Sequence, residues 1–163
     1  MAKKKTNLSS FDETKIPSAK GMKVAIVVSE WNPEITEALY YGAVVSLIEN
    51  GCEQKNIFRI SVPGSYELPT AAQFVATSKK VDAIICLGCV IQGETRHFDF
   101  ICNAVAHGLM NVSLKYNLPV IFGVLTPDNM QQARARAGGK HGNKGVEAAV
   151  SAIKMAALKR KSK

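Results

Sequence analysis

A cluster of reactive side chains follows one of the most apolar stretches of the chain. After the run at 82–91 and a glycine at position 93, Glu94, Thr95 and His97 lie almost side by side. Backbone N–H groups and the dipole at a helix start bind anions, and an imidazole transfers protons near neutral pH. The spacing favours a phosphate-binding turn beside an acid–base residue. Two simpler interpretations stay open, because Thr95 could only cap a helix and a single histidine is often structural.

Two other segments place unusual residues directly after an apolar run. Trp31, the only tryptophan, follows the first run, and Ser65, Tyr66 and Glu67 follow the second. An exposed tryptophan can stack on a flat heterocycle, and a carboxylate can accept hydrogen bonds from the hydroxyl groups of a polyol. The alternatives are a core tryptophan and an acid that simply favours a helix start.

Basic residues near the C-terminal end provide a possible phosphate site. Arg136 and Lys144 flank the glycine-rich stretch "AGGKHGN". A guanidinium suits phosphate, although a solvated basic helix would explain the same residues. Arg134 and Arg136 are two residues apart on a short predicted helix, so they face different ways and only one needs a partner. No Walker or G-x-G-x-x-G pattern occurs, which argues against a nucleoside triphosphate or a dinucleotide.

The remaining histidines and the four cysteines are interpreted as structural. His107 lies in mid-helix and is expected to pack, while His141 is expected at the surface. Cys86 and Cys89 form C-x-x-C, but a strand points residues three apart to opposite faces. A redox or zinc site is therefore not predicted, and no metal site is expected.

Strand and helix patterns alternate along the chain. We expect strands at 22–29, 56–64, 82–91 and 118–126, and helices at 31–51, 67–80, 97–116, 128–139 and 145–161. In the first helix Asn32 is the expected N-cap, Pro33 the first helical residue and Gly51 the stop signal. Runs rich in Val and Ile without polar alternation indicate a parallel sheet covered on both faces. The prediction is a three-layer α/β/α sandwich with a four-stranded parallel sheet and flavodoxin-like wiring, whose ligands bind at the carboxyl ends of the strands.

Composition limits the function classes. The net charge is +8, with lysines concentrated at both ends, but no aromatic residues accompany them and no nucleic-acid partner is expected. No run is long enough to span a membrane, and the N-terminus lacks the apolar stretch of a secretory signal. We expect a soluble cytoplasmic protein with a flexible N-terminal arm at 1–20, a single domain at 21–158 and a basic tail at 159–163.

Two predicted helices are apolar on more than one face. The helix at 97–116 has almost no polar residue on its outer side before Lys115, and the first helix adds Tyr40, Tyr41 and Ile48 beside its core stripe. A helix that only covers a sheet in a monomer shows a polar outer face. This pattern predicts a homo-oligomer.

Taken together, these residues resemble the lumazine synthase family. The resemblance covers 22–158 and rests on the segments "SEWNPEIT", "VPGSYELP", "LGCVIQGETRHFDFI", "PVIFGVLT" and "ARAGGKHGNKGVEAA". It implies the penultimate step of riboflavin biosynthesis. In that step 5-amino-6-(D-ribitylamino)uracil condenses with 3,4-dihydroxy-2-butanone 4-phosphate to give 6,7-dimethyl-8-ribityllumazine, without a metal or an organic cofactor.

The resemblance also implies roles for single residues. His97 matches the proton-transfer residue. The positions matching the binding of uracil and the ribityl chain are Trp31, Ser65, Tyr66, Glu67, Cys89, Val90, Ile91 and Phe122. The positions matching the phosphate-bearing substrate are Glu94, Thr95, Arg136 and Lys144. Tryptophan at position 31, where phenylalanine is commoner, and Gln92, where arginine is common, are departures that leave the implied activity in place.

The family further implies an assembly. Its members form pentamers or hollow shells of pentamers, and Phe122 and Arg136 match positions that serve a site on the adjacent subunit. The short loop at 137–145 and Pro17, which would direct the arm outward, favour a shell of about 60 subunits. Two rival interpretations are a non-catalytic flavin- or pterin-binding module and a nucleic-acid-binding or scaffold protein.

Overall fold

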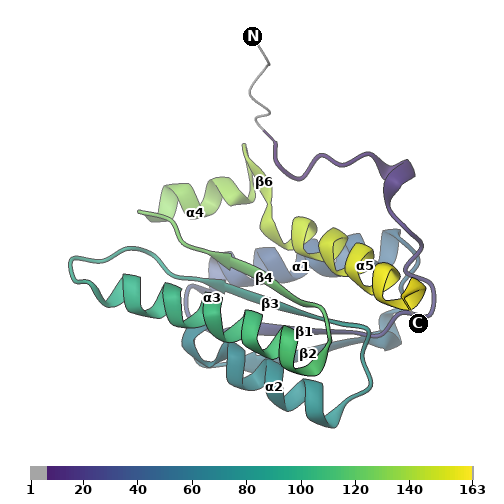
Figure 1. Ribbon diagram of the computed structural model, residues 1–163. Coiled ribbons are helices and arrows are strands. Elements are labelled where there is room, and N and C mark those ends of the chain that lie inside the picture. Colours follow the sequence, from purple (N-terminus) through teal and green to yellow (C-terminus); the bar gives the residue numbers. More distant parts are fainter. Residues whose placement is uncertain (1–6, 163) are drawn as a thin grey trace.

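The computed structural model describes residues 7–162, which are built around one four-stranded parallel sheet (Figure 1). The strands are β1 (Val24–Ser29), β2 (Ile57–Val62), β3 (Ala83–Cys89) and β4 (Val120–Leu125), in the order β2-β1-β3-β4. The central strand β1 pairs in parallel with both β2 and β3, and β3 pairs with β4. The predicted fold class is confirmed, with the wiring of a flavodoxin-like sheet.

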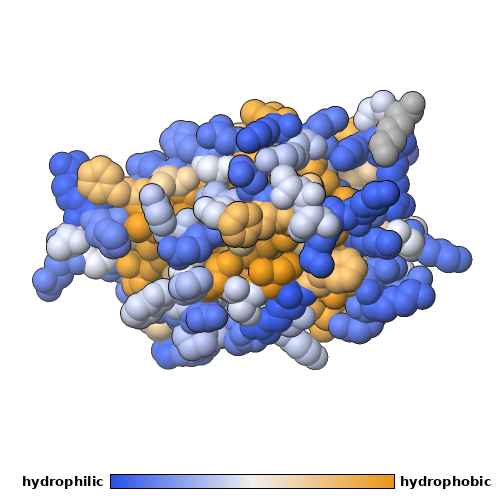
Figure 2. Space-filling model, turned by 90° about the horizontal axis from the view of Figure 1, so that it is seen from below, coloured by the Kyte–Doolittle hydropathy of each residue, from blue (hydrophilic) through white to orange (hydrophobic). Residues whose placement is uncertain are grey.

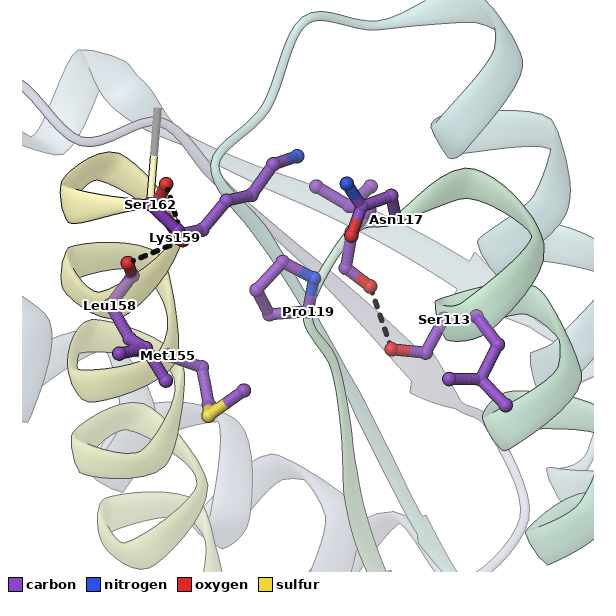
Figure 3. Close-up of a pocket in the computed structure, with 9 residues that line it drawn as sticks. Ser113, Asn117, Pro119, Met155, Leu158, Lys159 and Ser162 are labelled. Atoms are coloured by element: carbon purple, nitrogen blue, oxygen red, sulfur yellow. Dashed lines mark hydrogen bonds between the residues drawn. The ribbon is translucent and has the colours of Figure 1, made fainter.

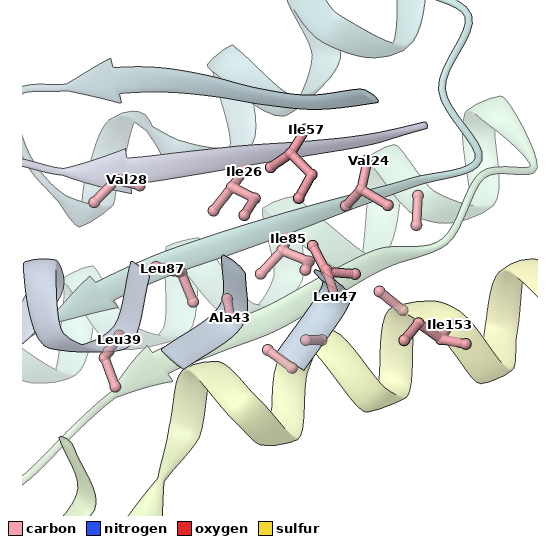
Figure 4. Close-up of a cluster of buried hydrophobic side chains, with 14 of the residues drawn as sticks. Val24, Ile26, Val28, Leu39, Ala43, Leu47, Ile57, Ile85, Leu87 and Ile153 are labelled. Carbon is pink, nitrogen blue, oxygen red and sulfur yellow. The ribbon is translucent and has the colours of Figure 1, made fainter. Parts of the chain in front are cut away.

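Helices cover both faces of the sheet. The helices α1 (Pro33–Glu49) and α5 (Lys144–Lys161) pack together on one face, and α2 (Leu68–Ser78) and α3 (His97–Tyr116) pack on the other. Every residue of β1 and β3 is buried, as their unbroken apolar sequences require. Side chains on the α1–α5 side, such as Ile26, Ile85 and Leu47, form one core (Figure 4), and a second core lies under α2 and α3.

The first helix begins and ends near the predicted signals. Pro33 is its first residue, and Gly51, with a φ of +98°, follows its C-terminal end. Asn32 occupies the N-cap position, but its side chain does not cap the helix. Instead its Nδ2 donates to the carbonyl of Cys89 at 2.8 Å, which ties the end of β1 to the end of β3.

The predicted helix at 128–139 is wrong at its C-terminal end. The helix α4 (Met130–Arg136) is followed by a small antiparallel hairpin of β5 (Ala137–Gly139) and β6 (Gly142–Asn143). Gly138 and Gly142 have φ values of +108° and +88°, which a continuing helix cannot accommodate. The hairpin turns the chain directly into α5.

The segment before β1 lies along α5 and the hairpin, and it is drawn in purple in Figure 1. The backbone N–H of Leu8 donates to the carbonyl of His141 at 3.1 Å, and that of Ala19 donates to Asn50 at 2.8 Å. A short 3₁₀-helix, η1 (Glu13–Lys15), lies between these anchors. Residues 1–6 of the predicted flexible arm, and Lys163 of the predicted basic tail, lie outside the described residues.

The outer face of α3 exposes several large apolar side chains. Phe100 and Leu114 are 72% and 73% exposed, and Met110 and the neighbouring Phe74 of α2 are also exposed. Figure 2 views the side of α2 and α3 and shows hydrophobic side chains across the middle of this face. His107 was predicted to pack, but it is exposed on the same helix, and its Nδ1 lies 2.8 Å from the Asn103 carbonyl. Within residues 7–162, none of the helices is both long and apolar enough to cross a membrane.

Candidate active site

One pocket of about 410 Å³ lies beyond the carboxyl ends of β1, β2 and β3. Three loops and the start of α3 build it, as the wiring of the sheet predicts. Its lining consists of Trp31, Asn32, Gly64, Ser65, Tyr66, Glu67, Cys89, Val90, Ile91, His97 and Ile101. The pocket therefore gathers residues that are far apart in the sequence into one volume.

The loop after β1 is fixed by backbone and side-chain contacts. The Glu30 N–H donates to the Val62 carbonyl at 2.8 Å, which extends the pairing of β1 with β2. Asn32 has a φ of 57°, in the left-handed region, and its bond to Cys89 holds the loop from the other side. Trp31 between them is 72% exposed, so its indole face is available to a ligand.

The loop after β2 holds Glu67 in a defined position. The residues Ser65–Glu67 form a 3₁₀-helix, η3, that leads into α2. The Gly64 N–H donates to Oε2 of Glu67 at 2.9 Å, so one carboxylate oxygen stabilises the turn. The structural and functional interpretations of Glu67 are thus compatible, because its second oxygen can still accept a hydrogen bond from a ligand.

Two buried hydroxyl groups, those of Ser29 and Ser65, lie near the carboxyl ends of β1 and β2. Among the described residues, neither Ser29 Oγ nor Ser65 Oγ has a protein hydrogen-bond partner. Both lie next to Gly88, where a Cβ atom would overlap Ser65 Oγ and would lie 3.3 Å from Ser29 Oγ. A buried hydroxyl without a partner costs roughly 1–3 kcal/mol. Ser65 belongs to the pocket lining, although its Oγ is covered by protein atoms in this structure.

The third loop extends the strand pairing past β3. The Val90 N–H donates to Leu125 at 2.9 Å, and the Gln92 N–H donates to Pro127 at 3.0 Å, which keeps Val90 and Ile91 against the pocket. Cys89 also lines the pocket, and burial raises the pKa of its thiol to about 11. Cys86 packs in the core on the opposite face, as the strand period predicts, so the C-x-x-C pair does not act as one unit.

His97 is the first residue of α3 and lines the mouth of the pocket. Arg96, rather than Thr95, occupies the N-cap position, while Thr95 Oγ1 accepts a long hydrogen bond of 3.4 Å from the His97 N–H. Glu94 and Thr95 are exposed in the turn just before this helix and are not part of the pocket lining. The open turn leaves room for an anion beside the imidazole.

A cluster of two cations and one acid lies elsewhere on the chain. Arg136 contacts Glu147 through two pairs of atoms, Nη1–Oε1 at 2.7 Å and Nη2–Oε2 at 2.9 Å, and it donates from Nη1 to the His141 carbonyl at 2.7 Å. Lys144 Nζ lies 3.4 Å from the same carboxylate. The side chains of Arg136 and Glu147 are only 20% and 15% exposed. The cluster keeps one net positive charge in a fixed, partly buried position.

The carboxyl of Glu147 remains charged in this setting. Burial raises its pKa, but the hydrogen bond from Arg136 and the charges of Lys144 and Arg136 outweigh burial and leave the pKa below its ordinary value. Arg134 forms a separate, exposed ion pair with Glu34, Nε–Oε1 at 2.6 Å. The two arginines contact different partners, Glu34 and Glu147, as side chains that face different ways.

The pocket contains eight of the predicted site residues, but five others lie outside its lining. Those outside are Glu94, Thr95, Phe122, Arg136 and Lys144. The sequence prediction missed three lining residues, Asn32, Gly64 and Ile101. Ile101 follows His97 by four residues on one helix face, a spacing that could have identified it. Asn32 acts through a side-chain hydrogen bond to a distant carbonyl and Gly64 through its backbone N–H, and both carry a weaker sequence signal.

A second pocket, of about 470 Å³, lies at the opposite edge of the sheet between the C-terminal ends of α3 and α5 (Figure 3). The two serine hydroxyl groups in its lining already donate to nearby backbone carbonyls: Ser113 Oγ to that of Leu118 at 2.7 Å and Ser162 Oγ to that of Leu158 at 2.9 Å. It contains none of the predicted site residues. The pocket at the carboxyl edge is therefore the candidate active site.

Comparison with known proteins identifies the family. The model of the 6,7-dimethyl-8-ribityllumazine synthase family matches residues 21–160. A protein of that name from Cytophaga hutchinsonii is 62% identical over 151 residues, covering 93% of this chain and 94% of that protein. One from Christiangramia forsetii is 52% identical over 164 residues, covering 100% of this chain and 98% of that protein. The chain therefore belongs to the 6,7-dimethyl-8-ribityllumazine synthase family.

Proposed function

We propose that the pocket binds 5-amino-6-(D-ribitylamino)uracil and joins it to 3,4-dihydroxy-2-butanone 4-phosphate. The products are 6,7-dimethyl-8-ribityllumazine, phosphate and water, and the chain acts in riboflavin biosynthesis as a transferase. Family membership supports this reaction. We place the reaction in this pocket because residues from the ends of three strands and from the start of α3 line the same cavity.

The pocket walls suit the pyrimidine substrate. In this proposal the exposed indole of Trp31 stacks on the uracil ring, and Tyr66, Cys89, Val90 and Ile91 surround the ring and the chain attached to it. The ribityl hydroxyl groups donate to the free oxygen of Glu67 and exchange hydrogen bonds with the Ser65 hydroxyl.

His97 transfers protons at the pocket mouth. The reaction forms an imine, eliminates phosphate, closes the second ring and loses water, and each step moves protons between nitrogen, carbon and oxygen atoms of the substrates. An imidazole at the junction of the pocket and the anion turn can serve these steps. Orientation of two substrates supplies up to ~7–11 kcal/mol, and one acid–base residue supplies ~10²–10⁴-fold. Positioning is thus the larger contribution.

The phosphate group of the second substrate needs a cation that the pocket lining lacks. We infer that Arg136 and Lys144 supply it, together with the open N–H groups of the turn at Glu94 and Thr95. A guanidinium has five N–H groups, so the three contacts of Arg136 to Glu147 and His141 leave capacity for phosphate oxygens.

These separate parts support a site shared between subunits. The pocket of one subunit would be completed by Arg136, Lys144 and Phe122 of its neighbour, and Phe122 is 37% exposed on the edge strand β4. The exposed apolar face of α3 supplies a surface that water disfavours and a neighbouring subunit would cover. We propose a pentamer in the cytoplasm.

We further propose that pentamers close into a hollow shell of about 60 subunits. The short hairpin between α4 and α5 supports close approach of neighbouring pentamers, whereas the net charge of +8 opposes it through repulsion. Light scattering and negative-stain microscopy at moderate salt test the shell. A uniform population of isolated pentamers, unchanged by added phosphate, would show that the shell does not form.

The assignment of the pocket is tested by a Trp31→Ala variant. It should raise the KM for the uracil substrate about five- to thirtyfold, because a lost ring contact of this kind is worth ~1–2 kcal/mol. The KM for the phosphate substrate should stay near the wild-type value. An unchanged KM for the uracil substrate would remove Trp31 and its pocket from the proposal. A non-catalytic flavin-binding module would bind lumazine with no turnover.

A further inference from the structure

The segment Leu8–Ser9 lies directly against the residues that hold Arg136. The Leu8 N–H donates to the His141 carbonyl at 3.1 Å, and this is the same carbonyl that accepts from Arg136 Nη1. Ser9 Oγ lies 3.3 Å from Oε1 of Glu147, and the same carboxylate contacts both terminal nitrogens of the Arg136 guanidinium. Both acceptors that fix Arg136 are therefore shared with the N-terminal segment.

Ser9 is locked into this position by a two-way contact. Its Oγ accepts from the Asn143 N–H at 2.6 Å and lies 2.9 Å from the Asn143 carbonyl. The single hydroxyl hydrogen thus has two acceptors within reach, the carbonyl of Asn143 and the carboxylate of Glu147. The side chain of Asn143 in turn accepts from the N–H groups of Gly145 and Val146 and starts α5.

The hairpin is shaped to receive the segment. At Gly142, φ is +88°, and a Cβ atom would overlap Ser9 Oγ and lie 2.5 Å from Oδ1 of Asn7. Glycine is therefore required both for the turn and for the close approach. Beyond Ser9 a hollow of about 460 Å³ separates the segment from α1 and α5. The contact at the hairpin is a local anchor rather than part of a continuous packed layer.

We propose that Leu8–Ser9 forms a clasp that positions Arg136 and Lys144 for phosphate binding. The clasp restrains the His141 carbonyl and the Glu147 carboxylate, and these two groups orient the guanidinium and draw Lys144 toward it. Ser9 and Glu147 are positioning residues, because they act through Arg136. The inference rests on the proposed phosphate role of Arg136, and it assigns an active-site contribution to the chain before β1.

Ser9→Ala tests the clasp, with Ser9→Thr as the conservative variant and Ser10→Ala as the matched control on an exposed neighbour. Ser9→Ala should raise the KM for 3,4-dihydroxy-2-butanone 4-phosphate and the inhibition constant of inorganic phosphate about three- to tenfold, the usual value of one hydrogen bond. The KM for the uracil substrate should not change, and the melting temperature should fall only by the few degrees that the loss of one hydrogen bond costs. Ser9→Thr should restore both phosphate constants, and Ser10→Ala should match the wild type.

Two results would overturn the clasp. One is a Ser9→Ala enzyme whose phosphate constants equal those of the wild type. The other is an equal rise in both KM values together with a lower melting temperature, which indicates a purely structural role. Arg136→Ala distinguishes a failure of the clasp from a failure of the phosphate role of Arg136. If Arg136→Ala weakens phosphate binding and Ser9→Ala does not, only the clasp fails. If Arg136→Ala has no effect, the proposed phosphate role itself fails.

Discussion

A mixture of two defective variants should recover activity if the site is shared between subunits. His97 lines the pocket, whereas Arg136 belongs to the cluster outside it. Alone, His97→Ala should lower turnover by up to ~10²–10⁴-fold. Alone, Arg136→Ala should lower kcat/KM for the phosphate substrate about ten- to hundredfold, because a lost charge-assisted contact costs ~1.5–3 kcal/mol. Neither variant alone can assemble a complete site.

The expected recovery follows from the geometry. In randomly mixed oligomers, half of the pockets carry His97 and half of the neighbouring subunits carry Arg136, so about one quarter of the sites are complete. Co-expression of the two variants with different affinity tags, followed by two-step purification, isolates the mixed oligomers. Their activity should reach about one quarter of the wild-type value, well above either parent.

A matched mixture supplies the control. His97→Ala combined with Trp31→Ala places both defects in the same pocket, so no mixed oligomer gains a complete site at any ratio. This mixture should show no activity above that of the better parent. If mixed oligomers of His97→Ala and Arg136→Ala also fail to recover, each site lies within one subunit and the shared-site proposal is refuted.

Three further outcomes follow from single contacts. Arg136→Ala should raise the KM for the phosphate substrate, whereas Arg134→Ala, which breaks only an exposed ion pair, should leave both KM values near wild type. Equal effects of the two variants on the phosphate KM would contradict the assignment. Gly88→Ala should weaken lumazine binding or lower stability, because the added methyl group would overlap the Ser65 hydroxyl. Gly93→Ala, where a methyl group meets open space, should bind lumazine normally, and equilibrium titration measures both variants. Glu147→Gln should lower stability at neutral pH by ~1–3 kcal/mol. Since the pKa of Glu147 is depressed on folding, its stabilisation is present above the unfolded pKa of about 4.3 and is lost as the pH falls further. The difference in melting temperature between variant and wild type should therefore shrink below that pH, and a constant difference would exclude the ionised carboxylate as its source.

The sequence predicts the sheet and the pocket well because both depend on local patterns. The runs that became β1 and β3 are apolar except for Ser29 at the end of β1, and such runs form buried parallel strands. Parallel strands bring their carboxyl ends to one edge of the sheet. The order of strands and helices is therefore enough to predict that Trp31, Glu67 and His97 lie around one pocket.

The features that the sequence did not predict depend on contacts and backbone geometry of the folded chain. The partner of Arg134 is Glu34, a hundred positions earlier in the chain, and no local pattern links them. The hairpin after Arg136 depends on the left-handed backbone of Gly138 and Gly142, whereas the sequence pattern there continues a helix. His107 was assigned to packing from its mid-helix position, yet it lies on the exposed side of α3.

The most direct test of the account is turnover by the purified protein with both substrates. Formation of 6,7-dimethyl-8-ribityllumazine is followed by its absorbance, and phosphate release is measured in the same samples. We expect both products to appear at equal rates, well above the rates of a protein-free mixture, and His97→Ala and Arg136→Ala to slow both together. Lumazine formation no faster than in the protein-free mixture, despite tight binding of lumazine to the protein, would contradict the proposed reaction.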